Sequence, residues 1–346
     1  MPKRPKLAVI LGAGASHDVC PDRGPIKDKK WTPPLVDTMF EGGALDEVLS
    51  QHPEAQALMS SVRTKLRAGG VFEEILRSYS DDPNGHIQWQ MAFVPIALHE
   101  FFFRVSNNYT SEAINYSHLV NSTVGQGIQT AYVTLNYDTL LEMSLARITG
   151  AGFGNLDSYV SSPDWILVKL HGSVGWGYPW DTTERIGEPR AAALENEPPP
   201  ALAESIEVGL PRLMWAHDRL FYPALSLPVV GKYGFVCPPQ HIDALRRFMI
   251  DCANFLFVGF SAKDRDLLDF LADTVQTFRC LHVVAGENDL EGVVERLAGA
   301  VPKLSNLRVE QIRADGPIGF SNFGFSRYLE QNIDHSCNLV LSQSSP

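Results

Sequence analysis

Residues 7–16 read LAVILGAGAS, and this stretch decides the fold that the sequence predicts. Leu7 to Leu11 form an apolar run, which is typical of a strand buried on both faces of a parallel sheet. The glycines that follow, Gly12 and Gly14, favour a tight turn into a helix. The stretch therefore predicts a strand, a turn and a helix in succession, the unit from which α/β folds are built.

Apolar runs of the same kind return along the chain. They lie at Ala131–Leu135, Ile166–Leu170, Phe255–Val258, Leu281–Val284 and Leu307–Ile312. Helical patterns follow several of them, at Asp138–Arg147, Asp264–Phe278 and Asp289–Leu297. Alternation of buried strands and helices predicts an α/β fold with a doubly wound, parallel, Rossmann-like sheet.

The spacing of these runs predicts one domain with two interruptions. Only helical patterns lie between the first two runs, so we expect a large helical insertion at residues 32–127. Residues 181–210 hold seven acidic residues, two arginines and four prolines, a composition typical of a surface loop. The expected single domain spans residues 1–340 and is followed by a tail at 341–346. Its core comprises about residues 5–31, 128–180 and 211–335.

The charge balance excludes some classes of partner. The 346 residues carry 29 Lys and Arg against 40 Asp and Glu, a net charge of −11. An acidic surface repels phosphate groups, so we expect no general binding of nucleic acid or of anionic membranes. No window reaches the ~18 apolar residues of a membrane span. The apolar run after Lys6 is also shorter than the roughly 7–15 residues of a signal peptide core.

The cysteines argue against a structural zinc site. The five cysteines, at positions 20, 237, 252, 280 and 337, form no Cys-x-x-Cys pair. A small, odd number of cysteines fits a reducing compartment, and we expect a cytoplasmic protein.

Four strand ends carry candidate site residues. After the first strand, Gly12, Ala13, Gly14 and Ser16 form a turn whose backbone could approach a phosphate at the start of a helix. The full Gly-x-Gly-x-x-Gly pattern is absent because position 17 is histidine. A tight turn into a helix would require the same glycines without any ligand.

The second strand is followed by Thr134-Leu135-Asn136-Tyr137-Asp138. Ligands of doubly wound sheets bind at the carboxyl ends of the strands, so Asn136 and Asp138 are candidate site residues. The alternative is that one of them only caps the helix that follows.

The third strand ends in Lys169-Leu170-His171-Gly172-Ser173, where His171 is a candidate base. The alternative is a structural histidine. Gly259, Phe260 and Ser261 follow the next strand, where a glycine and a hydroxyl suit a ribose or a phosphate, or simply a turn.

In this order, these motifs resemble the sirtuin-like family of NAD-binding proteins. The matching pieces are the Gly-Ala-Gly-x-Ser turn at 12–16, Thr-x-Asn-x-Asp at 134–138, His-Gly at 171–172 and Gly-Phe-Ser at 259–261. The last replaces the Gly-Thr-Ser of the protein deacylases. Thr-Leu-Asn-Tyr-Asp together with Lys-Leu-His-Gly-Ser looks like the bacterial antiphage branch of NAD hydrolases. The four-cysteine zinc module of the deacylases is missing, and Pro21-Asp22-Arg23 only partly matches the family's Pro-Asp-Phe-Arg segment.

The resemblance implies an NAD+ glycohydrolase that produces ADP-ribose and nicotinamide and depletes NAD+ during phage defence. NAD+ is then the substrate, and neither a cofactor nor a metal is expected. Asn136 and His171 would be the catalytic pair, and Asp138 would lie near the nicotinamide carboxamide. The 12–16 turn would hold the pyrophosphate, and Gly259, Phe260 and Ser261 would follow the adenosine side. Two alternatives remain, a nucleotide-binding regulatory subunit without turnover and a zinc-less protein deacylase.

An NAD hydrolase that is always active would be toxic, which predicts control by assembly. We expect a homo-oligomer, and by resemblance a separate partner such as a HerA-type hexameric ATPase or a short Argonaute. The candidate contact surfaces are the apolar stretch Ile87–Val105 and the acidic segment 181–210. The alternative for Ile87–Val105 is that it belongs to the core.

Overall fold

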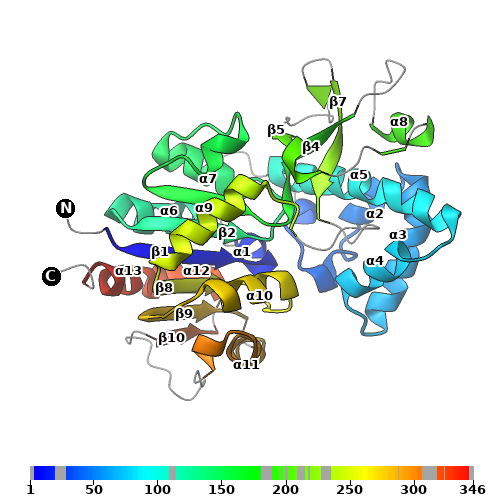
Figure 1. The fold of residues 1–346 in the computed structure, drawn as a ribbon. Coiled ribbons are helices and arrows are strands. Elements are labelled where there is room, and N and C mark those ends of the chain that lie inside the picture. The colour runs from blue at the N-terminus through cyan, green and yellow to red at the C-terminus, as the bar shows by residue number, and fades with distance from the viewer. Residues whose placement is uncertain are drawn as a thin grey trace.

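The central element is a six-stranded sheet in which all neighbouring strands are parallel (Figure 1). The structure is a computed structural model that describes residues 4–19, 29–108, 114–180, 189–195, 197–198, 202–208, 215–216, 219–226, 235–286, 288–305, 318–322 and 324–342. The strands are, from one edge to the other, β10 (Ile318–Ser321), β9 (Cys280–Val284), β8 (Asn254–Val258), β1 (Lys6–Leu11), β2 (Gln129–Thr134) and β3 (Trp165–Lys169).

The prediction of a doubly wound sheet is confirmed. Taken in chain order, the six strands lie 6-5-4-1-2-3, which is the strand order of Rossmann folds. The first five apolar runs of the sequence coincide with β1, β2, β3, β8 and β9. The sixth run, Leu307–Ile312, lies outside the described residues, and the sixth described strand of the sheet is Ile318–Ser321.

Strand β1 shows why these runs are apolar throughout. Leu7, Val9 and Leu11 point into the hydrophobic cluster on one face of the sheet, whereas Ala8 and Ile10 point into the cluster on the other. The first face is covered by α6 (Ile114–Thr123), α7 (Leu140–Thr149), α12 (Gly324–Gln331) and α13 (Ile333–Ser342). The second is covered by α9 (Pro239–Ile250), α10 (Arg265–Thr274) and α11 (Leu290–Ala300). Helices on both faces shield the sheet from solvent, which is why most residues of these strands are apolar.

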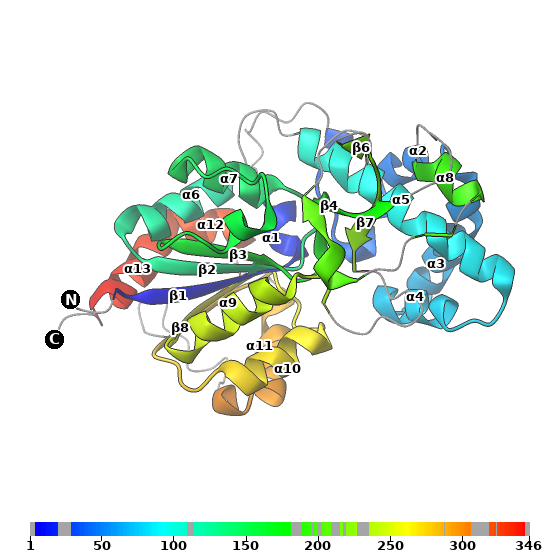
Figure 2. The ribbon, with the colours of Figure 1, turned by 45° about the horizontal axis from the view of Figure 1, so that its top comes forward.

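A second layer of structure lies beyond the carboxyl edge of this sheet (Figures 1 and 2). Its helices are α2 (Ala44–Leu49), α3 (Pro53–Arg67), α4 (Phe72–Ser80), α5 (Gly85–Asn108) and α8 (Pro189–Glu195). Its four strands form an antiparallel sheet in the order β5 (Glu207–Val208), β4 (Gly172–Trp180), β7 (Arg219–Leu225) and β6 (Trp215–Ala216). Short 3-10 turns lie at Lys29–Trp31, Val36–Thr38, Val124–Gln126, Leu156–Tyr159, Ala203–Ser205 and Pro302–Leu304.

The sequence did not predict this antiparallel sheet. Strand β4 reads GSVGWGYPW, in which glycines and a proline interrupt the apolar residues. The segment 181–210, expected to be a loop, also contains α8 and β5. In the residues expected to form a helical insertion, α2 to α5 belong to the outer layer, whereas α6 packs beside α7 on the parallel sheet. Helix α13 continues to Ser342, two residues into the expected tail.

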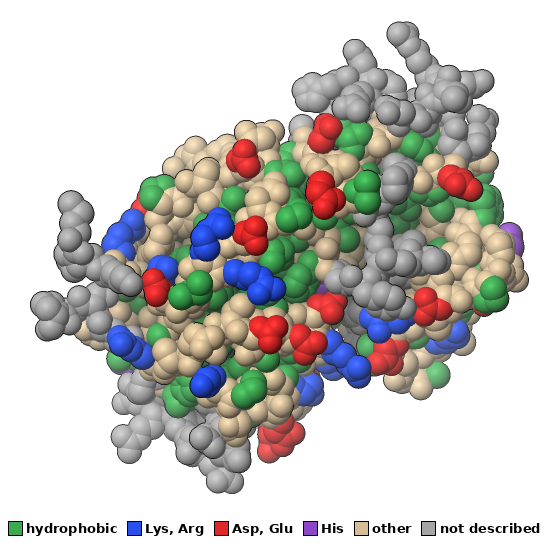
Figure 3. Space-filling view, in the orientation of Figure 1, with side chains coloured by type: hydrophobic (Ala, Val, Ile, Leu, Met, Phe, Trp, Pro, Cys, Tyr) green, Lys and Arg blue, Asp and Glu red, His purple; other side chains and the backbone are tan. Residues whose placement is uncertain are grey.

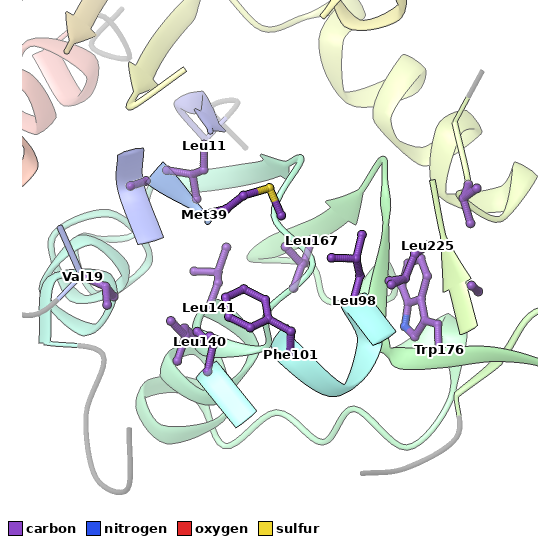
Figure 4. Packing of buried hydrophobic residues seen from close by; sticks show 14 of the residues in the cluster. Leu11, Val19, Met39, Leu98, Phe101, Leu140, Leu141, Leu167, Trp176 and Leu225 are labelled. Carbon is purple, nitrogen blue, oxygen red and sulfur yellow. The ribbon is translucent and has the colours of Figure 1, made fainter. Parts of the chain in front are cut away.

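The apolar stretch Ile87–Val105 is part of the core. It forms most of α5, where Met91, Val94, Leu98 and Phe101 are buried. Figure 4 shows Leu98 between Leu167 of the parallel sheet and Trp176 of the antiparallel sheet, and Phe101 beside Leu141 of α7. Its apolar side chains therefore join the two layers, and the expectation that this stretch offers a contact surface is wrong for most of its length.

The described residues hold no group of three or more His, Cys, Asp or Glu side chains placed to bind a metal ion. Four cysteines, Cys237, Cys252, Cys280 and Cys337, are buried and unpaired as disulfides. No described helix combines the length and the apolarity needed to cross a membrane. On the face seen in Figure 3, described acidic and basic side chains are interspersed.

Candidate active site

Four neighbouring strands end at the same level. In the pairing register Leu11 lies opposite both Val258 and Thr134, and Thr134 lies opposite Lys169. The loops that follow β8, β1, β2 and β3 therefore leave the sheet side by side. From β1 the chain adds β2 and β3 toward one edge of the sheet, and from β8 it adds β9 and β10 toward the other edge, so a switch point lies between β1 and β8. Ligands of doubly wound folds bind outside the carboxyl ends of the strands at such a point. Figure 2 shows α1 (Ala13–His17) at this edge.

The glycines of the turn after β1 pack backbone to backbone against the loop after β8. The Gly12 amide donates to the Val258 carbonyl at 3.0 Å, and the Gly14 amide donates to the Gly259 carbonyl at 3.1 Å. A Cβ atom on Gly12 would lie 2.7 Å from the Phe260 Cα, and one on Gly14 would lie 2.8 Å from the Gly259 Cα. No side chain fits at either position.

Gly259 is required for two reasons. Its φ of +57° lies in the left-handed region, and an added Cβ would lie 2.6 Å from the Gly14 Cα. The tight-turn interpretation thus accounts for all three glycines. Since the amides of Gly12 and Gly14 already donate to the protein itself, a pyrophosphate at this turn would need other donors, and Ala13 is the residue that begins the helix.

Asn136 is fixed against this turn. Its Nδ2 donates to the Gly12 carbonyl at 2.9 Å and to the Ser16 hydroxyl at 2.9 Å. Because a carbonyl only accepts, the NH2 side of the amide must face Gly12, and this sets the orientation of the side chain. Among the described residues, none donates to Asn136 Oδ1. The amide oxygen is thereby left as an acceptor for a ligand or a water molecule.

Ser16 and Tyr116 form the support behind Asn136. Their hydroxyls lie 2.8 Å apart, and the Tyr116 hydroxyl is also 3.4 Å from Asn136 Nδ2. Both side chains are buried. Burial and the nearby Asp138 carboxylate raise the pKa of Tyr116, so the hydroxyl stays protonated and available for hydrogen bonding. Ser16 therefore hydrogen-bonds to Asn136 and is shielded from solvent.

Asp138 is buried just before the next helix, whose N-cap position is Thr139. Its Oδ1 accepts from the amide of Leu140, the first residue of α7, at 3.1 Å, so its side chain supports the start of that helix without being its N-cap. Its backbone carbonyl accepts a hydrogen bond from Lys169 Nζ. Lys169 in turn pairs with Glu142 at 2.9 Å, in surroundings where their side chains are 1% and 6% exposed. Burial raises the pKa of Glu142, and Lys169 offsets only part of that shift.

His171 contacts an acid that comes from the other side of the switch point. Its Nε2 lies 2.9 Å from Asp264 Oδ2, and both side chains are 18% exposed. Burial alone would raise the pKa of Asp264, but the hydrogen bond and charge of His171, with the Leu267 amide, outweigh it and lower that pKa. His171 is thus not an isolated structural histidine.

The backbone beside His171 is held by the antiparallel sheet. Gly172 has a φ of +83°, and a Cβ there would lie 2.9 Å from the carbonyl carbon of Ala224. The His171 carbonyl accepts from the Ser226 amide at 2.8 Å, and the Tyr137 hydroxyl donates to the Ser226 carbonyl at 2.9 Å. The loops after β2 and β3 are therefore joined through the end of β7.

The two remaining candidates differ in exposure. Phe260 is buried and stacks on Phe257, with ring centroids 6.1 Å apart, so its side chain serves the core rather than a ligand. Ser261 is exposed, and its carbonyl accepts from Arg296 at 2.9 Å. Pro21-Asp22-Arg23 lies outside the described residues.

Sequence reasoning missed three residues at this edge: Asp264, Tyr116 and Lys169. Asp264 had a usable signal, because an acid before the helical pattern at 265 predicts an N-cap close to the Gly259 loop. Tyr116 had none, since it lies 100 residues from Ser16 in the chain.

No family model matches the chain, and neither does any curated protein. Similar solved structures include a Sir2 homolog–NAD complex, 13% identical with a TM-score of 0.42 over 99% of this chain and 92% of that one. A mutant Sir2 homologue with 2'-O-acetyl ADP ribose is 14% identical with a TM-score of 0.42, over 99% and 95%. Sir2 bound to acetylated peptide is 12% identical with a TM-score of 0.39, over 95% and 92%. Such low values assign no activity, so any functional assignment has to rest on the residues at the sheet edge.

Proposed function

We propose that the protein hydrolyses NAD+ to ADP-ribose and nicotinamide. The observation that supports this most is the placement of an amide and an imidazole at equivalent positions on adjacent strands. Asn136 and His171 each stand two residues beyond a pair of residues in register, Thr134 and Lys169. Asn136 contacts Gly12 of the loop after β1, and His171 contacts Asp264 of the loop after β8. These two loops flank the switch point, where doubly wound sheets bind nucleotides.

The chemistry needs no acid on the leaving group. Nicotinamide in NAD+ carries a positive charge at the ring nitrogen, so the electron pair of the breaking C–N bond returns to that nitrogen and a neutral molecule leaves. Water then forms the new bond to the ribose carbon and must lose a proton. A glycosidase acting on an oxygen-linked sugar, by contrast, has to protonate its leaving group.

The two remaining tasks are to position the water and to accept its proton, and we assign them to Asn136 and His171. No described residue donates a hydrogen bond to Asn136 Oδ1, so this atom can accept one from the attacking water. The hydrogen bond would hold the water in line with the C–N bond that breaks. His171, as a neutral imidazole, can take the proton from the water or from a ribose hydroxyl. Ala13, Gly259 and Ser261 are the proposed contacts to the pyrophosphate and the adenosine side, and Asp138 Oδ2 is the proposed contact to the carboxamide.

The direct test is to incubate the purified protein with NAD+ and measure nicotinamide release, alone and with Asn136→Ala or His171→Ala. We expect each variant to lose about 10²-fold or more of the rate, the usual contribution of a positioned base or water ligand. His86→Ala is the matched control, because His86 is exposed at the start of α5 in the outer layer.

Other outcomes would identify other functions. Binding of NAD+ by calorimetry without nicotinamide release would favour a regulatory subunit. Release that requires an acetyl-lysine peptide and yields deacetylated peptide would favour a protein deacylase. Wild-type rates in either site variant would remove that residue from the mechanism.

We propose further that the protein acts as an antiphage effector and is controlled by assembly. Unrestrained NAD+ hydrolysis depletes a metabolite that the cell needs, so such an enzyme requires restraint. A homo-oligomer is the simplest form of control, and a separate partner, such as a HerA-type ATPase or a short Argonaute, is a second. Leu194 and Leu202, which are 49% and 56% exposed within the segment 181–210, are candidate contacts. Light scattering tests this directly: a strict monomer with full turnover and no added factor would contradict it.

A further inference from the structure

The contact between His171 and Asp264 joins loops that start far apart on the sheet. Strands β3 and β8 are separated by β1 and β2, so three strand spacings, or about 14 Å, lie between their ends. The two side chains nevertheless meet at 2.9 Å, on the edge where the 12–16 turn and Asn136 lie. Neither the strand register nor the capping of a helix requires this contact.

The geometry fixes the histidine tautomer. Ionised Asp264 can only accept hydrogen bonds, and its Oδ1 already accepts from the Leu267 amide at 2.7 Å. Its Oδ2 faces His171 Nε2, so Nε2 must carry the hydrogen. In a neutral imidazole the other nitrogen, Nδ1, is then the basic atom. No described residue hydrogen-bonds to Nδ1.

Two features keep Asp264 in place. It is the N-cap of α10, which ties its carboxylate to the first turn of that helix. The residue two positions earlier, Ala262, is buried and has a φ of +53°, a conformation that a non-glycine residue adopts only where the surroundings enforce it. The loop after β8 is thus shaped to bring the acid back over the sheet edge.

We propose that Asp264 is a positioning residue that holds His171 as the Nε2–H tautomer, so that Nδ1 is the atom that accepts the proton. This inference rests on the proposed NAD+ hydrolysis. The proton moves from water to Nδ1 as the water oxygen bonds to the ribose carbon, and the electron pair of the broken C–N bond neutralises nicotinamide. The imidazolium then returns the proton to solvent.

The test is the substitution Asp264→Asn. Asparagine caps helices as well as aspartate does, so α10 should remain intact. If the Asn oxygen keeps the Leu267 amide, its NH2 group faces His171 Nε2 and forces the hydrogen onto Nδ1. We expect kcat for NAD+ to fall by about 100-fold or more while KM changes less than about three-fold, because the base is lost and the binding groups are not.

A spectroscopic measurement separates this inference from the proposed function. NMR of protein labelled with isotopic nitrogen at histidine reports which ring nitrogen carries the hydrogen. We expect Nε2–H at His171 in the wild type and a shift of the hydrogen to Nδ1 in Asp264→Asn. If the wild-type protein releases no nicotinamide, the proposed function fails, yet this readout still tests the positioning.

The matched control is Asp266→Asn, an exposed acid in the first turn of the same helix, which should change neither kcat nor the His171 spectrum. The inference is wrong if Asp264→Asn retains wild-type kcat, or if wild-type His171 carries its hydrogen on Nδ1.

Discussion

The loops after β1 and β8 and the loops after β2 and β3 leave the same sheet edge but are built differently. The first two meet through glycines, with main chain against main chain and no room for a Cβ atom. The second two present Asn136 and His171 and are supported by a buried ion pair. Close approach of two backbones excludes side chains, whereas proton transfer and water positioning require them. At this edge, therefore, the loops after β1 and β8 fix the course of the backbone, and the loops after β2 and β3 carry the candidate reactive side chains.

The largest effect on stability should come from the ion pair under the polar loops. Lys169→Met leaves Glu142 buried without its partner, and breaking a buried pair costs about 3–5 kcal/mol. Burial raises the pKa of Glu142, and without Lys169 that pKa rises further. A raised pKa means that stability is present at low pH and lost as the pH rises, so the deficit should be larger near about pH 8 than near about pH 5.

Urea denaturation at both pH values measures this deficit. The double variant Lys169→Met with Glu142→Gln should recover part of the loss, since no buried charge is then left alone. Lys263→Met, at an exposed lysine in the loop after β8, is the matched control and should stay close to the wild type. A Lys169→Met protein as stable as the wild type would show that the polar loops do not depend on the pair.

The stability lost when a glycine is replaced by alanine should depend on whether the new Cβ atom causes a steric overlap, a strained left-handed φ, or both. Gly259→Ala adds a left-handed φ to a steric overlap, and we expect a loss of about 3 kcal/mol. Gly12→Ala introduces the overlap alone, since its φ is −101°, and should cost about 2 kcal/mol. Gly150→Ala is the control for φ alone, because its φ is +73° and nothing lies within 4 Å, and should cost about 1 kcal/mol.

Equal losses in the three glycine variants would contradict the backbone-packing account. Unchanged stability in Gly12→Ala, combined with loss of NAD+ binding, would instead support the interpretation of this turn as a phosphate site. The comparison of stability with binding thus decides which of the two interpretations of the glycines is correct.

The sequence by itself predicted the parallel sheet and the strand ends that carry the candidate residues. Runs such as Leu7–Leu11 are apolar on both faces because helices cover both sides of the sheet. The result is an uninterrupted apolar run, which can be recognised in the sequence. Asn136 and His171 could be found for the same reason, since a polar residue directly after a buried strand has to lie at the sheet edge. The antiparallel sheet had no such signal, because β4 mixes glycine, proline and aromatic residues.

Only the tertiary structure decided how the edge is completed. Asp264 and His171 are 93 residues apart, and Ser16 and Tyr116 are 100 apart. The sequence also left open whether Ile87–Val105 was surface or core. These outcomes depend on which elements pack together over long chain separations, and local periodicity holds no information about that. Buried polar groups find their partners only when the fold has closed, so the network around Asn136 and His171 appears first in three dimensions.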